Sequence, residues 1–190
     1  SISNNCLTCH GVESWYDAST HTISGRAHFL PFDLPGFRYG TGAFTRSAQE
    51  EAFRKLNNMV RTTTDGTTAT NELLDGAYQP GGIANVGSTW HDDFIPADWK
   101  VGSYQDYPTL YRGVVAPYCR TCHQTAATFR DFADASDFDG LLSAIRTRTC
   151  QTADAFMFMP HAEHPMRKFW ASGARAYLNA WTGDTTGCKP

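Results

Sequence analysis

Two short segments of the chain combine cysteine and histidine in the same order. They are Cys6-Leu7-Thr8-Cys9-His10 and Cys119-Arg120-Thr121-Cys122-His123, so Cys-x-x-Cys-His occurs twice in 190 residues. The two thiols of such a segment lie about one helical turn apart and can form thioethers with the vinyl groups of one haem. The adjacent imidazole can then reach the iron as its proximal ligand. The repeat predicts two covalently bound haem c groups, attached at Cys6, Cys9, Cys119 and Cys122, with His10 and His123 as iron ligands.

The Cys-x-x-Cys spacing also occurs in thioredoxin-like redox pairs and in zinc sites. A redox pair does not require histidine in the next position, and it belongs in a βαβ context that the sequence does not suggest. A zinc site assembled from both segments would leave the repeat of the whole pentapeptide unexplained. We therefore favour two haems.

Two of the six cysteines, Cys150 and Cys188, lie outside these segments. An even remainder in a protein that matures outside the cytoplasm predicts a disulfide between them. In the chain-entropy model, a bridge across a loop of this length stabilises the fold by about 3–4 kcal/mol. The alternative is a pair of buried thiols.

The composition is that of a globular chain, with 41% hydrophobic and 18% charged residues and a net charge of −3. No Lys/Arg-rich run is present, which argues against a nucleic-acid partner. No apolar run is long enough for a transmembrane segment. The chain starts at Ser1 without a signal peptide, so we expect an exported protein whose leader was removed, located in the periplasm or outside the cell.

Residues 1–104 form the first expected unit, an irregular haem-wrapping region. Glycines, prolines and aromatics around 29–37 predict extended chain that covers a haem. Ser47 and Glu50 form a capping box that opens a helix to about Val60, with Met59 on its apolar stripe.

The second part of this unit carries weaker patterns. A short helix is expected around 71–78 and irregular chain over 79–104. Three aromatics of that stretch are expected to pack between the two halves, namely Trp90, Phe94 and Trp99.

Residues 105–190 form the second expected unit and have a clearer helical pattern. Pro108 suits the first turn of a helix that leads into Cys119, and Ser136 suits the cap of another. A last helix is expected after Pro165 and ends at Gly183. Its apolar stripe contains Trp170, Ala174, Tyr177, Leu178 and Trp181. Since strand-like alternation is scarce, we predict a mostly α-helical protein.

Residues 105–182 resemble a class I cytochrome c domain. The resemblance rests on the helix entering Cys119–His123, the intervening helix, the pair Met159-Pro160 and the aromatic C-terminal helix. It implies a class I-like helical fold, with Met159 as the sixth iron ligand opposite His123. A thioether ligand raises the haem potential, whereas a second imidazole would lower it. His161 is the second choice for this ligand, and two further neighbours compete for it, namely Met157 and His164.

The class I layout does not extend to the haem of the N-terminal half, so the resemblance does not supply its sixth ligand. We place His28 first, since it directly precedes the segment expected to wrap the haem. The alternatives are His21, His91, Met59, a residue of a neighbouring molecule, or an open iron.

The whole chain is similar to bacterial dihaem c-type cytochromes. This resemblance implies an electron carrier between redox proteins outside the cytoplasm rather than an enzyme. Because the first haem lies at the N-terminus, copies of the chain stacking their haems into a filament are a variant of this hypothesis. The alternative is a dihaem enzyme with one open iron, either a peroxidase or a small-molecule dehydrogenase. A haem-based gas sensor is the third.

Overall fold

The computed structural model describes residues 7, 10–63, 68–101, 106–124, 131–149 and 163–183, and over these ranges the chain is mostly helical. Strands in the described ranges form two small antiparallel sheets, β1–β2 and β3–β4. The mostly α-helical fold is thus confirmed. In chain order the elements are β1(Gly11–Asp17), β2(Thr22–Ala27), η1(Leu34–Gly36), η2(Gly42–Phe44), α2(Arg46–Arg61), α3(Thr68–Ala77), β3(Tyr78–Gln79), β4(Thr89–Trp90), α4(Asp98–Val101), α5(Tyr107–Leu110), η3(Tyr111–Cys119), α6(Arg120–His123), α7(Ala135–Gly140), α8(Leu142–Thr149), α10(Glu163–Ala171) and α11(Ala174–Thr182).

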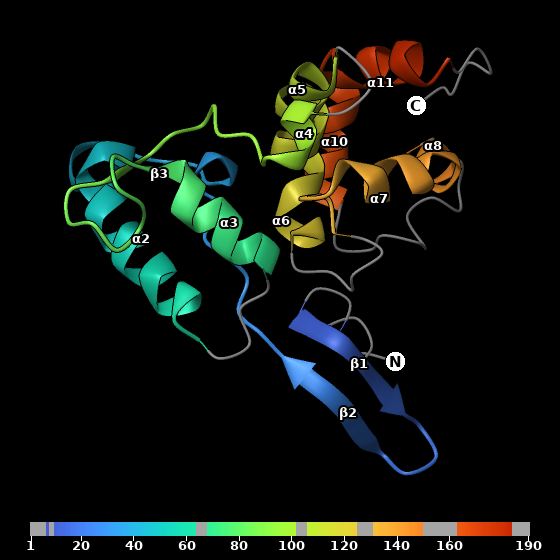
Figure 1. Cartoon of the computed structure of the whole chain (residues 1–190), viewed down its shortest axis with the longest axis horizontal. Helices are drawn as coiled ribbons and strands as arrows, with labels where there is room; N and C mark the ends of the chain where they lie inside the picture. Colours follow the sequence, from blue (N-terminus) through green and yellow to red (C-terminus); the bar gives the residue numbers. More distant parts are fainter. Residues whose placement is uncertain are drawn as a thin grey trace.

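The hairpin β1–β2 projects away from two groups of helices (Figure 1). Its strands pair from Gly11 opposite Ala27 to Asp17 opposite Thr22, and a bulge interrupts the register. The turn is held by Asp17, whose carboxylate accepts hydrogen bonds from the amide and hydroxyl of Ser19. The sequence predicted irregular chain here and no paired strands.

The helices α2 and α3 pack with β3 and β4 around a first hydrophobic cluster. Helix α2 is confirmed, but its predicted cap is wrong, because the side chain of Thr45 rather than Ser47 accepts the bond from the Ala48 amide. Glu50 instead accepts from the amide of Trp90 at 2.5 Å. The buried members are Leu34, Val60, Leu73, Leu74, Ala77, Tyr78, Ile83 and Trp90.

The C-terminal helices surround a second hydrophobic cluster. Trp99 lies at its centre, with ring centroids 5.2–5.5 Å from those of Tyr107, Tyr111 and Phe138. Its indole nitrogen donates to the carbonyl of Phe132 at 3.0 Å. Trp99 therefore belongs to this cluster, whereas Trp90 and Phe94 pack with the first. The division at residue 104 stays a prediction, but the second cluster already begins before it.

One continuous helical segment, α5–η3–α6, leads into the second Cys-x-x-Cys-His sequence. Its middle part, η3, is a π-helix that contains Pro117. Proline has no amide hydrogen to donate, so a wider turn is tolerated at this position.

The C-terminal helix differs from the expected one, because it begins at Glu163 and is divided into α10 and α11 around Gly173. Its end at Gly183 is confirmed, with the glycine at a φ of 66°. The predicted apolar stripe packs on the second cluster, and Leu178 is fully buried in it. None of the helices in the described ranges is long and apolar enough to cross a bilayer.

Candidate haem sites

His10 ends the first Cys-x-x-Cys-His sequence and is fixed by the strand that follows it. Its carbonyl accepts a hydrogen bond from the His28 amide at 2.8 Å, continuing the β1–β2 ladder by one pair. Its ring Nδ1 lies 3.1 Å from the His28 carbonyl oxygen. Because a carbonyl can only accept, Nδ1 must carry the proton, which leaves the Nε2 lone pair for a metal. A histidine that binds a metal through one ring nitrogen commonly donates such a hydrogen bond from the other, which holds the ring in place.

His28, the first choice for the sixth ligand of the N-terminal haem, lies directly beside His10 in the strand pairing. Its side chain is buried, with 6% exposed, and its backbone is paired directly with His10. Opposite residues in such a pair have Cα atoms only about 5.5 Å apart, whereas two axial ligands must approach one iron from opposite faces of the porphyrin. In this arrangement the His28 carbonyl orients the His10 ring. A role for His28 as sixth ligand of the same iron, which would require the ladder to open, stays a prediction.

The alternative distal ligands are dispersed. His21 lies at the hairpin turn with a φ of 55° and is hydrogen-bonded to the Tyr16 hydroxyl at 2.8 Å. His91 is exposed and lies 4.0 Å from Asp93. Met59, expected in the core, has 66% of its surface exposed. Among the described residues, His10 forms its ring hydrogen bond with His28 and not with any of these three side chains.

The second Cys-x-x-Cys-His sequence lies on helical turns at the end of the α5–η3–α6 segment. Cys119 ends η3 and Cys122 follows one turn later in α6, so both thiols can reach one side of the helix. The ring of His123 stacks on that of Phe132, with centroids 4.1 Å apart and an angle of 3° between the planes. The carbonyl of His123 accepts from the Phe132 amide at 2.9 Å.

The two histidines are thus held in similar ways. Each backbone carbonyl accepts an amide from a later segment, His28 in one case and Phe132 in the other. Each ring is also fixed, by a hydrogen bond at His10 and by stacking at His123. Two oriented imidazoles, each next to a Cys-x-x-Cys, fit the donor set of a c-type haem.

Cys119 packs against the second hydrophobic cluster. Burial raises the pKa of its thiol to about 12. In the part of the chain that the structure describes, no three His, Cys, Asp or Glu residues converge as a metal site would require.

The intervening residues of the second sequence contact the N-terminal half. Arg120 forms a two-pronged ion pair with Asp33, at 2.9 Å from Nε and 2.6 Å from Nη2. Both side chains are buried, with 2% and 4% exposed. Burial alone would lower the pKa of Arg120, but the Asp33 carboxylate raises it above its usual range. Thr121 also donates to Asp33, and Gln124 donates to the carbonyl of Ala69 at 2.7 Å.

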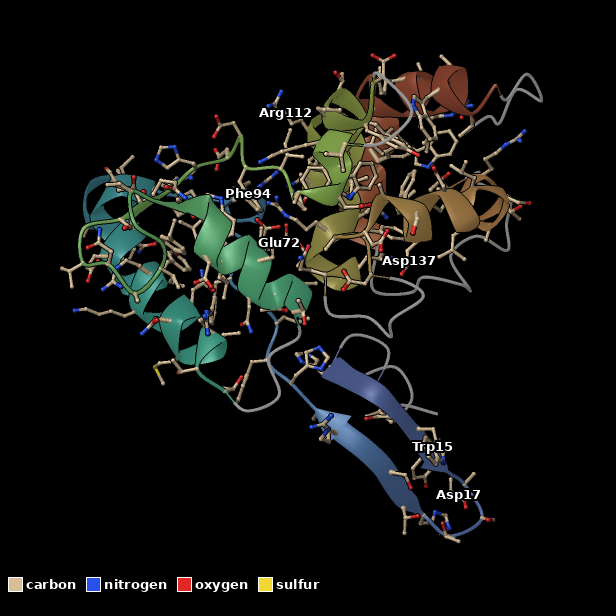
Figure 2. The ribbon with its side chains drawn as sticks, viewed as in Figure 1. Trp15, Asp17, Glu72, Phe94, Arg112 and Asp137 are labelled. Carbon is tan, nitrogen blue, oxygen red and sulfur yellow. The ribbon has the colours of Figure 1, made fainter. Side chains whose placement is uncertain are left out.

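An acidic group lies next to the His123–Phe132 stack. Burial raises the pKa of Asp131 to about 7, against a hydrogen bond from the Ala133 amide that favours the carboxylate. The nearby carboxylates of Asp137 and Asp134 raise it further. Figure 2 shows Asp137 on the side of α7. The carboxyl of Asp131 therefore changes its charge near neutral pH. The sequence analysis did not single out this residue.

Several predicted site residues lie outside the described residues. They include the attachment cysteines Cys6 and Cys9 and the expected sixth ligand Met159 with its competitors Met157 and His161. For His164, only its place in α10 is described. The disulfide between Cys150 and Cys188 also falls there and stays a prediction.

Asp33 and Phe132 are the functional candidates that sequence reasoning missed. Asp33 lies 87 residues before Arg120, and no local pattern links the two.

Comparison of the chain with protein-family models, with curated proteins and with solved structures gave no match.

Proposed function

We propose that the chain is a dihaem c-type cytochrome that carries electrons between redox proteins outside the cytoplasm. Residues 105–182 would form its class I cytochrome c-like domain. The observation that supports this proposal best is the hydrogen bond from Nδ1 of His10 to the carbonyl of His28, which leaves the Nε2 lone pair of a Cys-x-x-Cys-His histidine available for a metal.

The haem iron would supply one-electron chemistry by changing between the ferrous and ferric states. Cys6 and Cys9 would hold one haem by thioether bonds, and Cys119 and Cys122 the other. His10 and His123 would be the proximal ligands, each fixed by the contacts described above. Met159 is proposed as the sixth ligand opposite His123.

The residues around the second site would fix the position of the haem ligand and exclude water from it. Cys119 packs against the second hydrophobic cluster, whose core contains Tyr111, Val115 and Phe169. Phe132 covers one face of the His123 ring. A fixed ligand and little access for water favour electron exchange with small rearrangement of the surroundings, as an electron carrier requires.

Carbon monoxide binding to the fully reduced protein distinguishes this function from the enzymatic alternative. The number of covalent haems per chain is measured first, and the optical spectrum is then followed after addition of the gas. An unchanged spectrum means that both irons hold two protein ligands, as the carrier predicts. Rapid binding at one haem would contradict it and would favour a peroxidase, a dehydrogenase or a sensor with an open iron.

Another copy of the chain is a candidate redox partner. Trp15 and Ile23 of the projecting hairpin are each 60% exposed, and Figure 2 shows Trp15 on its outer part. A two-stranded hairpin is only marginally stable without a covering partner. The exposed apolar side chains of the hairpin support association between copies of the chain through this element. A filament in which the copies stack their haems is one form of such an association.

A further inference from the structure

One segment of the N-terminal half touches both Cys-x-x-Cys-His sequences. It runs from His28 to Asp33 and is called the strap below. At its start, the His28 backbone is paired with His10. At its end, the Asp33 carboxylate binds Arg120 and Thr121, the two residues between Cys119 and Cys122.

The strap is short and stiff. Five residue steps of extended chain span at most about 18 Å, so the two ends cannot separate further than that. Pro31 has a fixed φ, and it restricts Leu30 before it to extended conformations. Pro31, like His28 and Asp33, is buried.

The middle of the strap is also anchored. The amide of Phe32 donates to the Asn57 side chain at 2.7 Å, and the Asn57 amide group donates back to the Phe32 carbonyl at 2.9 Å. Asn57 is itself fully buried and donates to the Tyr78 hydroxyl at 3.0 Å. The strap is therefore tied at three points, to the first haem sequence, to α2 and to the second haem sequence.

We infer that the strap fixes the distance and orientation between the two haem-binding sequences, and that Asp33 is its positioning residue. This inference rests on the proposed dihaem function. One electron would pass from a ferrous iron at one site to a ferric iron at the other, with no bond formed or broken. Because electron transfer slows steeply with distance, the strap would set the rate of this step.

Asp33 would also influence the electrostatics of the second site alone. Its charge is balanced by Arg120, and both groups are buried where charges interact strongly. Loss of the carboxylate leaves the Arg120 charge unbalanced next to the His123 site. A positive charge favours the reduced iron, so the potential of that haem rises, while the haem at His10 keeps its potential.

The test compares Asp33→Asn with Asp92→Asn in the protein carrying its haems. Asp92 forms the matched surface pair, with both carboxylate oxygens 2.7 Å from the Arg46 guanidinium and about half of the side chain exposed. Hydrogen exchange of residues 28–34 reports opening of the strap. The potentials of the two haems and the transfer rate after a pulse of a photogenerated one-electron reductant report the positioning.

In D33N we expect strap exchange at least about tenfold faster than in the wild type, because an unpaired buried charge strongly favours local opening. We also expect a raised potential at the His123 haem and slower transfer between haems. D92N should match the wild type in strap exchange, in both haem potentials and in the rate of transfer between haems. Unchanged exchange and transfer in D33N, or equal effects in D92N, would overturn the inference.

A second variant covers the case in which D33N does not fold. Arg120→Lys keeps both charges but lacks the two-pronged geometry of the guanidinium. Faster strap exchange in R120K supports the inference, and wild-type exchange overturns it. The mass of the denatured wild type distinguishes failure of the proposed function from failure of the strap. Fewer than two bound haems would refute the dihaem function, whereas two haems with an unaffected strap would refute only the role of Asp33.

Discussion

Replacement of Asp131 by asparagine should stabilise the protein in alkaline but not in acidic solution. Burial raises the pKa of Asp131 from its ordinary value of 3.8 to about 7. The folded state therefore holds the proton more tightly than the unfolded chain does. The resulting stabilisation is fully present below the unfolded pKa of 3.8, and it is lost as the pH rises through about 7.

The size of the effect follows from the two pKa values. A difference of about 3 pH units at 1.36 kcal/mol each corresponds to about 4 kcal/mol as an upper limit. Asparagine carries no charge, and its side-chain oxygen can still accept the bond from the Ala133 amide at 2.9 Å. We therefore expect D131N to gain roughly 2–4 kcal/mol over the wild type at about pH 8.5 and almost nothing at about pH 4.

Guanidinium unfolding of both proteins at a series of pH values measures this difference. Asp17→Asn is the control with the opposite sign, because hydrogen bonds from Ser19 lower the pKa of Asp17. Its contribution is present above the unfolded pKa and is lost as the pH falls through the folded pKa, so D17N should lose stability at high pH. If D131N and the wild type had parallel stability curves, the raised pKa of the partly buried Asp131 would be refuted.

Three further predictions concern packing, capping and association. Asn57→Ala should destabilise the fold by roughly 2–4 kcal/mol in guanidinium unfolding, because it leaves several buried hydrogen-bonding groups without their partner. Thr45→Ala should cost about 1 kcal/mol as the loss of a helix cap, whereas Ser47→Ala should change stability by less than about 0.5 kcal/mol. Sedimentation should show concentration-dependent association of the wild type that is lost when Trp15 and Ile23 are both replaced by serine.

Each of these has an outcome that contradicts it. An N57A variant as stable as the wild type would mean that Asn57 does not anchor the strap at Phe32. A larger loss of stability in Ser47→Ala than in Thr45→Ala would support the predicted capping box. Phe44→Ser is the control for association, since Phe44 is 67% exposed outside the hairpin. Wild-type protein that stays monomeric at all concentrations would argue against association through the hairpin.

Local patterns in the sequence predicted most of the helices. The apolar spacing predicted the helix α2 but not its buried face, because the buried residues of this helix are Arg54, Asn57 and Val60. The stripe from Trp170 to Trp181 packs as expected on the second cluster. The hairpin was missed because a bulge between Val12 and Trp15 breaks the alternation that identifies a strand. Met59 was expected in the core because it follows the helical period of α2, but its side chain is exposed.

The chemistry of the candidate sites was predictable only in part. Cys-x-x-Cys-His is local, so both attachment sequences and their histidines could be found by reading five residues at a time. The bond from His10 to His28 depends on strand pairing, and the ion pair of Asp33 with Arg120 joins residues 87 positions apart. A charged residue in a sequence is usually solvated, so burial of this pair could not be expected from composition.

The most direct test of the dihaem assignment is the intact mass of the exported protein after denaturation and solvent extraction of non-covalent haem. The assignment predicts a mass increase of two haems per chain. It also predicts the loss of one haem when Cys6 and Cys9 are replaced by alanine, and of the other when Cys119 and Cys122 are replaced. A chain that carries no covalent haem, or whose haem content is indifferent to these cysteines, would contradict it.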